Sequence, residues 1–153
     1  MISNKTKYGL QALLSLARDF GRGPILIADL AEKERIPRKF LETILLQLKN
    51  AGILGSRKGR GGGYFLARDP AEITMGSAVR LLEGSLAPLP CVSESAYQKC
   101  EECLDETSCG IRLVMKDIRD AIAGILDHTS LKDVLERSDK AARNAREIID
   151  YSI

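Results

Sequence analysis

Residues 36–67 read IPRKFLETILLQLKNAGILGSRKGRGGGYFLA, and this stretch decides the fold. In its first half, apolar residues recur at three- and four-residue steps, which is the period of one helical face. These residues are Phe40, Leu41, Ile44, Leu45 and Leu48. Pro37 suits the first turn of a helix and Gly52 suits the residue after its end. The spacing therefore predicts a helix from about Pro37 to Asn50.

The second half of the stretch predicts a β-hairpin. Two short apolar or aromatic runs, 53–56 and 64–67, flank a glycine-rich turn. The turn carries three cations, Arg57, Lys58 and Arg60, and no acidic residue occurs between Leu54 and Ala67. Cations on such a turn offer contacts to phosphate, and the glycines permit close approach of the backbone to a partner.

The residues before this stretch predict a helix over 5–20, a short strand over 25–27 and a second helix over 28–35. The first helix has one apolar face, made by Leu10, Leu13, Leu14, Ala17 and Phe20. A short helix, a tight turn and a helix with a strong apolar stripe form a helix-turn-helix pattern. A hairpin that follows such a unit is a wing, which reaches the minor groove of DNA while the second helix lies in the major groove.

The residues after the stretch predict two further helices and an irregular segment. Thr74 is placed to cap a helix through Leu82, and no periodicity follows until residue 108. Residues 108–127 then show the spacing of a coiled-coil seam, with Ile111, Val114, Ile118, Ala121 and Ile125. Two heptads are short for a coiled coil, so packing of this helix on its own domain stays open.

The predicted fold class is mainly α with a small β-hairpin, a winged helix-turn-helix domain followed by a long helix. We expect three parts: the winged domain at 1–84, a cysteine-containing loop at 85–107, and a long helix with a C-terminal tail at 108–153. Ser130 and Asp133 resemble a capping box for a last helix.

The charge is divided between the two halves of the chain. Residues 1–68 hold 13 Lys and Arg against 5 Asp and Glu, and the remainder holds 10 against 16. This division favours a polyanion-binding module, although two solvated faces of one domain are the alternative. A phosphate-binding loop is excluded because no lysine followed by Ser or Thr opens a helix. No apolar run approaches a membrane span, no secretory pattern opens the chain, and no catalytic base or cofactor fingerprint is present, so we expect a cytoplasmic protein that is not an enzyme.

All four cysteines, Cys91, Cys100, Cys103 and Cys109, fall in one window. In a cytosolic chain, grouped thiols more often bind metal or react than form structural disulfides. Three or four thiolates can hold an iron–sulfur cluster or a tetrahedral zinc. A reversible disulfide, for example between Cys100 and Cys103, and inert thiols are the remaining interpretations.

Several of these motifs together resemble the Rrf2 family of bacterial winged-helix regulators, which includes IscR, NsrR and CymR. They are the cysteine window and Tyr8-Gly9-Leu10, Leu30-Ala31, Phe40-Leu41-Glu42 and Gly61-Gly62-Gly63-Tyr64. The resemblance implies a homodimer in which the long helix packs against its mate. It also implies a recognition helix that reads bases near Lys39 and Glu42. Lys58 holds the position of the family's usual wing arginine, and lysine lacks the planar fork for guanine.

The resemblance places Cys91, Cys103 and Cys109 on the family's three ligand cysteines and leaves Cys100 as a fourth ligand. Arg112 stands where cluster-binding relatives often have histidine, and arginine cannot ligate. We therefore expect a transcriptional regulator whose binding to double-stranded DNA is controlled by a 2Fe-2S or 4Fe-4S cluster. A zinc-dependent or cluster-free thiol regulator of the same fold is the alternative. The DNA-binding residues expected are Arg38, Lys39, Glu42, Arg57, Lys58, Arg60 and Gly61.

Overall fold

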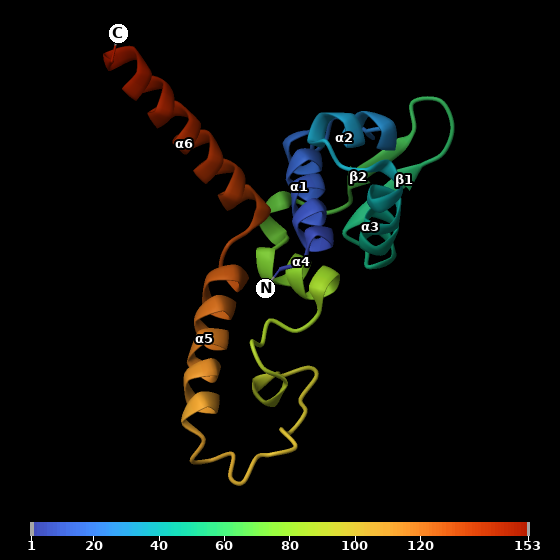
Figure 1. Cartoon of the computed structure of the whole chain (residues 1–153). Helices are drawn as coiled ribbons and strands as arrows, with labels where there is room; N and C mark the ends of the chain where they lie inside the picture. The colour runs from blue at the N-terminus through green and yellow to red at the C-terminus, as the bar shows by residue number, and fades with distance from the viewer. Residues whose placement is uncertain (1, 153) are drawn as a thin grey trace.

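The computed structural model describes residues 2–152 and contains six α-helices and one two-stranded sheet in that range (Figure 1). Two single-turn 3-10 helices, Pro70–Glu72 and Pro90–Val92, also occur. The elements that form the winged head are α1 (Asn4–Arg18), α2 (Ile27–Glu34), α3 (Arg38–Asn50), β1 (Leu54–Arg57), β2 (Gly63–Leu66) and α4 (Met75–Glu83). Two long helices follow, α5 (Gly110–Asp127) and α6 (Leu131–Tyr151). The predicted fold class is confirmed.

The head has a continuous apolar core between α1, α2, α3 and α4. Its largest fully buried side chains are Leu13, Leu16, Leu30, Leu41, Ile44, Leu45, Leu48 and Ile73. Burying one such side chain contributes about 1.5–3 kcal/mol, so this core makes the head a folded unit. Leu131, the first residue of α6, is also fully buried in this core and fixes the start of that helix to the head.

The wing is an antiparallel hairpin with Leu54 opposite Leu66 and Arg57 opposite Gly63. Ile25 adds one bridge to Tyr64 beside β2, but α2 already begins at Ile27, so the predicted strand over 25–27 is wrong beyond its first residue. Gly63 has φ 136°, and a Cβ at this position would run into the carbonyl of Ile25. The run of glycines before Tyr64 therefore has a packing role as well as a role in the turn.

Two aromatic residues that the periodicity placed in the core lie at the surface instead. Phe40 is 52% exposed on α3, and Phe20 follows the last turn of α1 with 43% exposed. On α1 the buried face is formed by Gly9, Ala12, Leu13 and Leu16. That helix contacts α2, α3, α4 and α6 together, which widens and rotates its buried face.

Past its first turns, α6 projects away from the other elements, as Figure 1 shows. No residue of α5 is buried, and α6 buries only Leu131. The predicted capping box is confirmed, since Ser130 and Asp133 each accept from the other's backbone N–H. The tail beyond Arg137, which the sequence left open, continues as helix to Tyr151. Within residues 2–152, no helix is both long enough and apolar enough to cross a membrane.

Candidate nucleic-acid interface and cysteine segment

The N-terminal turns of α3 present the polar residues that the sequence singled out. Arg38, Lys39 and Glu42 are all exposed, on the faces of α3 that do not enter the core. Arg38 Nε donates to Glu42 Oε1 at 3.2 Å, an i,i+4 ion pair that holds the Glu42 carboxylate beside a cation. A second helix of a winged unit that carries charge on its free face can read the major groove.

The wing turn carries its cations into solvent. Arg57, Lys58, Arg60 and Gly61 are exposed, and Figure 1 shows the turn projecting from the head on the side away from α6. The Arg57 guanidinium lies 5.9 Å from the centre of the Phe65 ring, so it is held against β2 by a cation–π contact. The other three residues form the free tip of the wing.

The cysteine segment, residues 85–109, brings two of the four thiols together. Cys91 is buried in the 3-10 turn Pro90–Val92, and Cys100 is exposed. A hydrogen bond with the Cys91 thiol is the main cause of a raised pKa at Cys100, and the negative charges of neighbouring thiolates add to it. Cys103 follows in a turn, where its backbone N–H donates to the Cys100 carbonyl at 3.2 Å. Cys109 is the N-cap residue of α5, as expected from its place in the sequence.

The donor chemistry of this segment fits an iron–sulfur cluster or zinc, because soft thiolates are the ligands that both prefer. The positions of the sulfur atoms, however, do not form a complete ligand set. Within residues 2–152, no three His, Cys, Asp or Glu side chains gather closely enough to hold a metal ion. The rest of the segment is held by short-range polar contacts, including Tyr97 to Glu106 and Asp105 to Thr107. Hydrogen bonds from Ser108 and Thr107 lower the pKa of Asp105 to about 2.

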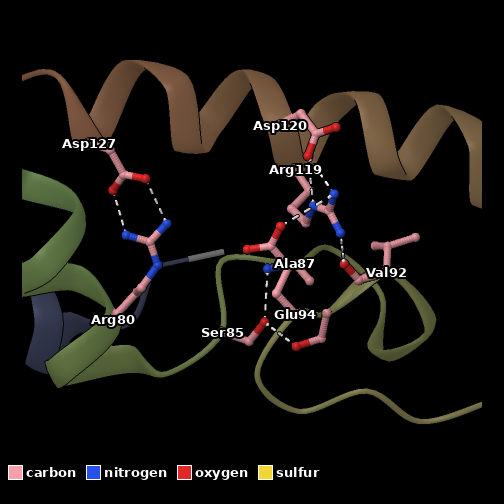
Figure 2. Close-up of polar contacts among 9 residues, drawn as sticks. Arg80, Ser85, Ala87, Val92, Glu94, Arg119, Asp120 and Asp127 are labelled. Carbon is pink, nitrogen blue, oxygen red and sulfur yellow. Dashed lines mark hydrogen bonds and ion pairs between the residues drawn. The ribbon is translucent and has the colours of Figure 1, made fainter.

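Two arginines of α5, Arg112 and Arg119, hold the cysteine segment against that helix, and Figure 2 shows the contact of Arg119. Arg119 Nη1 donates to the Val92 carbonyl at 2.6 Å, and Arg112 Nε donates to the Cys91 carbonyl at 3.3 Å. The Arg119 side chain is only 15% exposed and also pairs with Asp120 and Glu94. The sequence identified Arg112 only as a residue that cannot ligate, and it gave no signal for Arg119.

A third arginine joins α5 to the head. Arg80 of α4 makes a bidentate pair with Asp127, with nitrogen–oxygen distances of 2.5 and 2.9 Å (Figure 2). The hydrogen bond from Arg80 lowers the pKa of Asp127. Gly76 makes the approach possible, because a Cβ there would meet the Asp127 carboxylate. The partners are 47 residues apart, and nothing in the sequence pointed to this pair.

The two faces of α5 differ. Arg112, Met115, Arg119 and Ala123 are half-buried on the face toward the cysteine segment. The other face carries a stripe of exposed apolar side chains, which we call the α5 stripe. Its members are Ile111, Val114, Ile118, Ile122 and Ile125. Their three- and four-residue spacing is typical of a helix that packs along a second helix.

The single histidine lies at the end of α5. His128 follows the last residue of α5, and its Nδ1 is 2.8 Å from the Gly124 carbonyl. It therefore satisfies a carbonyl at the helix end.

Residues 2–137 match the family model Rrf2, described as an iron-dependent transcriptional regulator. The chain is 40% identical over 146 residues to an rrf2-like HTH-type transcriptional regulator of Rhodobacter capsulatus, which covers 94% of this chain and 97% of that protein. It is 33% identical over 138 residues to the regulator CymR of Bacillus subtilis, covering 90% of this chain and 91% of CymR.

Solved structures are also similar to this chain over nearly its whole length. The structure of CymR, the global cysteine regulator of B. subtilis, matches with a TM-score of 0.75 and 32% identity, covering 90% of this chain and 97% of that one. The structure of T. potens IscR matches with a TM-score of 0.72 and 31% identity, covering 92% and 90%. Relatives of both kinds, named CymR and IscR, are therefore similar to this chain along nearly its whole length.

Proposed function

The chain belongs to the Rrf2 family of transcriptional regulators, and from this premise we propose that it acts in the cytoplasm as a homodimer whose DNA binding is set by the state of its cysteine segment. Each head would contact one half of a two-fold site on double-stranded DNA. In this proposal Arg38, Lys39 and Glu42 face the major groove. Arg57, Lys58, Arg60 and Gly61 would then follow the backbone and minor groove, as the wing. The boundaries expected from the sequence, 1–84, 85–107 and 108–153, would correspond to the head, the sensor and the dimer-forming part.

The observation that carries this proposal is a continuous set of contacts from the thiols to the head. The backbone of Cys91 and Val92 is held by Arg112 and Arg119 of α5, and α5 is held at its other end by Arg80 of α4. A change in the conformation of residues 91–92 would therefore shift α5 relative to the head. Such a shift alters DNA affinity only to the extent that the two states differ in their contacts to DNA.

The α5 stripe supports the dimer. Five exposed apolar side chains line one face of a helix that buries nothing in its own chain. A second copy of α5, packed along this face, would cover them and fix the separation between two heads. A displaced α5 would then alter the spacing of two heads on one DNA duplex, which explains how a small segment could control binding.

We propose that Cys91, Cys100, Cys103 and Cys109 hold an iron–sulfur cluster, with zinc as the alternative. When bound, either group would supply a cationic centre that keeps the thiolates together. The chain's own contribution is to offer four thiols on a segment with little regular structure and to anchor one end of it, at Cys91, to α5. The acidic residues around the window, such as Glu101 and Glu102, oppose free thiolates and favour a cationic partner for them.

One observation favours a second candidate, a thiol switch without a metal. The Cys91 thiol is the main influence that raises the pKa of Cys100, so the two thiols lie near each other. Peroxide could oxidise the pair to a disulfide: the two thiols lose two electrons and two protons, and one peroxide becomes two water molecules. The sequence suggested Cys100 and Cys103 for this role, whereas the influence of Cys91 on Cys100 favours that pair.

The test of the leading candidate is anaerobic purification followed by visible spectroscopy with iron and sulfide analysis. We expect visible absorption with stoichiometric iron and sulfide, lost in Cys103→Ala and kept in Lys99→Ala, an exposed neighbour of Cys100. Colourless protein with stoichiometric zinc would contradict the cluster. Colourless protein free of metal would favour the thiol switch, and mass spectrometry after peroxide should then find Cys91 linked to Cys100.

A further inference from the structure

A small hollow lies at the start of α3, and the proposed function gives it no role. It is lined by Lys5 of α1 and by Lys39, Phe40, Thr43 and Ile44 of α3, with a volume of about 250 Å³. Its floor is apolar and its rim carries two cations, and no carboxylate lines it. An apolar hollow with a cationic rim suits a partner that is apolar at one point and anionic on either side.

The apolar floor is held in place. The Phe40 ring packs edge-on against Tyr8, with centroids 6.2 Å apart and planes at 80°, and still exposes 52% of its surface. The Thr43 hydroxyl lies 3.4 Å from the Lys39 carbonyl of its own helix, which leaves the Thr43 methyl for a partner. An aromatic ring and a threonine methyl both make favourable contact with the methyl group of thymine.

The position of the hollow selects DNA among possible occupants. It lies on the exposed side of the helix that the proposed function places in the major groove, next to Lys39. In that groove thymine alone among the four bases presents a methyl group, and phosphates flank it along each strand. Lys5 and Lys39 are positioned to meet those phosphates.

On the basis of the proposed function, we propose that this hollow recognises a thymine in each half-site through the C5-methyl group of that base. Phe40 and Thr43 are then specificity-determining residues, and Lys5 and Lys39 are positioning residues that contact the backbone. This adds an apolar reading element to the polar one supplied by Glu42. It also accounts for the exposure of Phe40, which the apolar period of α3 placed in the core.

The test removes a single methyl group from the DNA. Duplexes bound by the full-length protein are first selected from a random library, and each thymine of the selected site is then replaced in turn by uracil, which lacks only that methyl. We expect one thymine per half-site at which uracil weakens binding about fourfold, the value of one buried methyl group. In Phe40→Ala this difference between thymine and uracil should disappear at that position.

Leu46→Ala is the matched control, because Leu46 is a 50% exposed leucine of the same helix that does not line the hollow. It should keep the difference between thymine and uracil, as should the conservative variant Phe40→Leu, which retains an apolar floor if Phe40→Ala fails to fold. If the selection yields no bound duplex, the proposed function fails. If DNA binds and no thymine position distinguishes uracil, or Phe40→Ala still distinguishes them, the hollow does not read thymine.

Discussion

The head and α5 differ in where their apolar side chains go. The head buries leucines and isoleucines from four helices in one core. In α5, by contrast, isoleucines at comparable helical spacing remain exposed, and no residue is buried. The head therefore completes its fold within one chain, whereas α5 keeps an apolar face that its own chain leaves exposed.

The two regions also differ in the contacts that hold them. The core of the head depends on burial, which is lost only by unfolding. The contacts between α5 and its surroundings include hydrogen bonds from Arg80, Arg112 and Arg119. A hydrogen bond from a charged group typically contributes about 1.5–3 kcal/mol, and solvent screening reduces this to about 1 kcal/mol or less for the half-exposed Arg80–Asp127 pair. Such contacts can exchange while the head stays folded. In the proposed function, α5 would therefore move without disturbing the surface proposed to bind DNA.

The largest effect is expected from a charge in the middle of the α5 stripe. Ile118→Glu would place an unpaired carboxylate in the proposed interface between two copies, and burying such a charge is strongly unfavourable. We expect a monomer in analytical ultracentrifugation and about a 100-fold loss of affinity for a two-fold site. Circular dichroism should be unchanged, because Ile118 is not part of the core of the head.

Lys116→Glu is the control for this variant. Lys116 is exposed on the same helix outside the stripe, and the substitution changes the charge by more than Ile118→Glu does. It should leave the dimer intact. A dimer that survives Ile118→Glu would contradict the assignment of the stripe and remove the contrast between α5 and the head.

The next effect concerns the wing. Arg57→Ala combined with Arg60→Ala removes two cations from the turn, so binding should weaken about 10- to 100-fold on every sequence tested. The slope of log affinity against log salt should fall by about 2 for each head. Fluorescence anisotropy over a salt series measures both quantities. Arg143→Ala with Arg146→Ala removes the same charge from exposed positions of α6 and should change neither, whereas equal losses in both variants would place the DNA elsewhere.

The sequence predicted the elements of the head because a buried helical face leaves a period in the chain. Leu41, Ile44, Leu45 and Leu48 are all buried, as the spacing indicated. Phe40 is the exception, because periodicity reports which residues are apolar and cannot distinguish the core from a surface that meets a partner.

The contacts between distant segments were beyond reach of the sequence for a different reason. Arg80 meets Asp127, and Arg119 meets the carbonyl of Val92, across intervals that no helical or strand period links. Likewise, the spacing of the cysteines favoured Cys100 with Cys103, while the path of the loop brings Cys91 to Cys100. Such pairings depend on how the loop folds back, and a single sequence carries no record of that.

A smaller effect is expected where the cysteine segment meets α5. Arg119→Ala removes the donor to the Val92 carbonyl, so local opening around the buried Cys91 should become easier. We expect metal-free, reduced protein to alkylate at Cys91 about tenfold faster, measured by mass spectrometry, with the stability of the head unchanged. Arg137→Ala, on α6, should not change the rate. An unaltered rate in Arg119→Ala would mean that this arginine does not hold the segment.

The smallest effect tests how the head itself is closed. Glu83, at the end of α4, accepts hydrogen bonds from the Thr6 hydroxyl at 2.5 Å, the Ser3 hydroxyl at 2.7 Å and the Ser3 N–H at 2.9 Å. These bonds favour the ionised form and lower the pKa of Glu83 to about 2. Because the residue is exposed, solvent screening limits their contribution, and we expect Glu83→Gln to lower the free energy of unfolding by less than about 1 kcal/mol at neutral pH.

The sign of the pH dependence follows from the direction of the shift at Glu83. In the unfolded chain the glutamate pKa is about 4.3, so the folded head binds fewer protons than the unfolded chain between that value and about 2. The stabilisation is therefore complete above about pH 5 and is lost as the pH falls toward 2. In urea titrations, the difference between the wild type and Glu83→Gln should shrink over this range, while Glu147→Gln on exposed α6 should show no such trend. A difference that stays constant down to pH 2 would mean that the carboxylate does not tie α4 to the start of α1. The closure of the head would then depend on its apolar core alone, and the contrast with α5 would be sharper still.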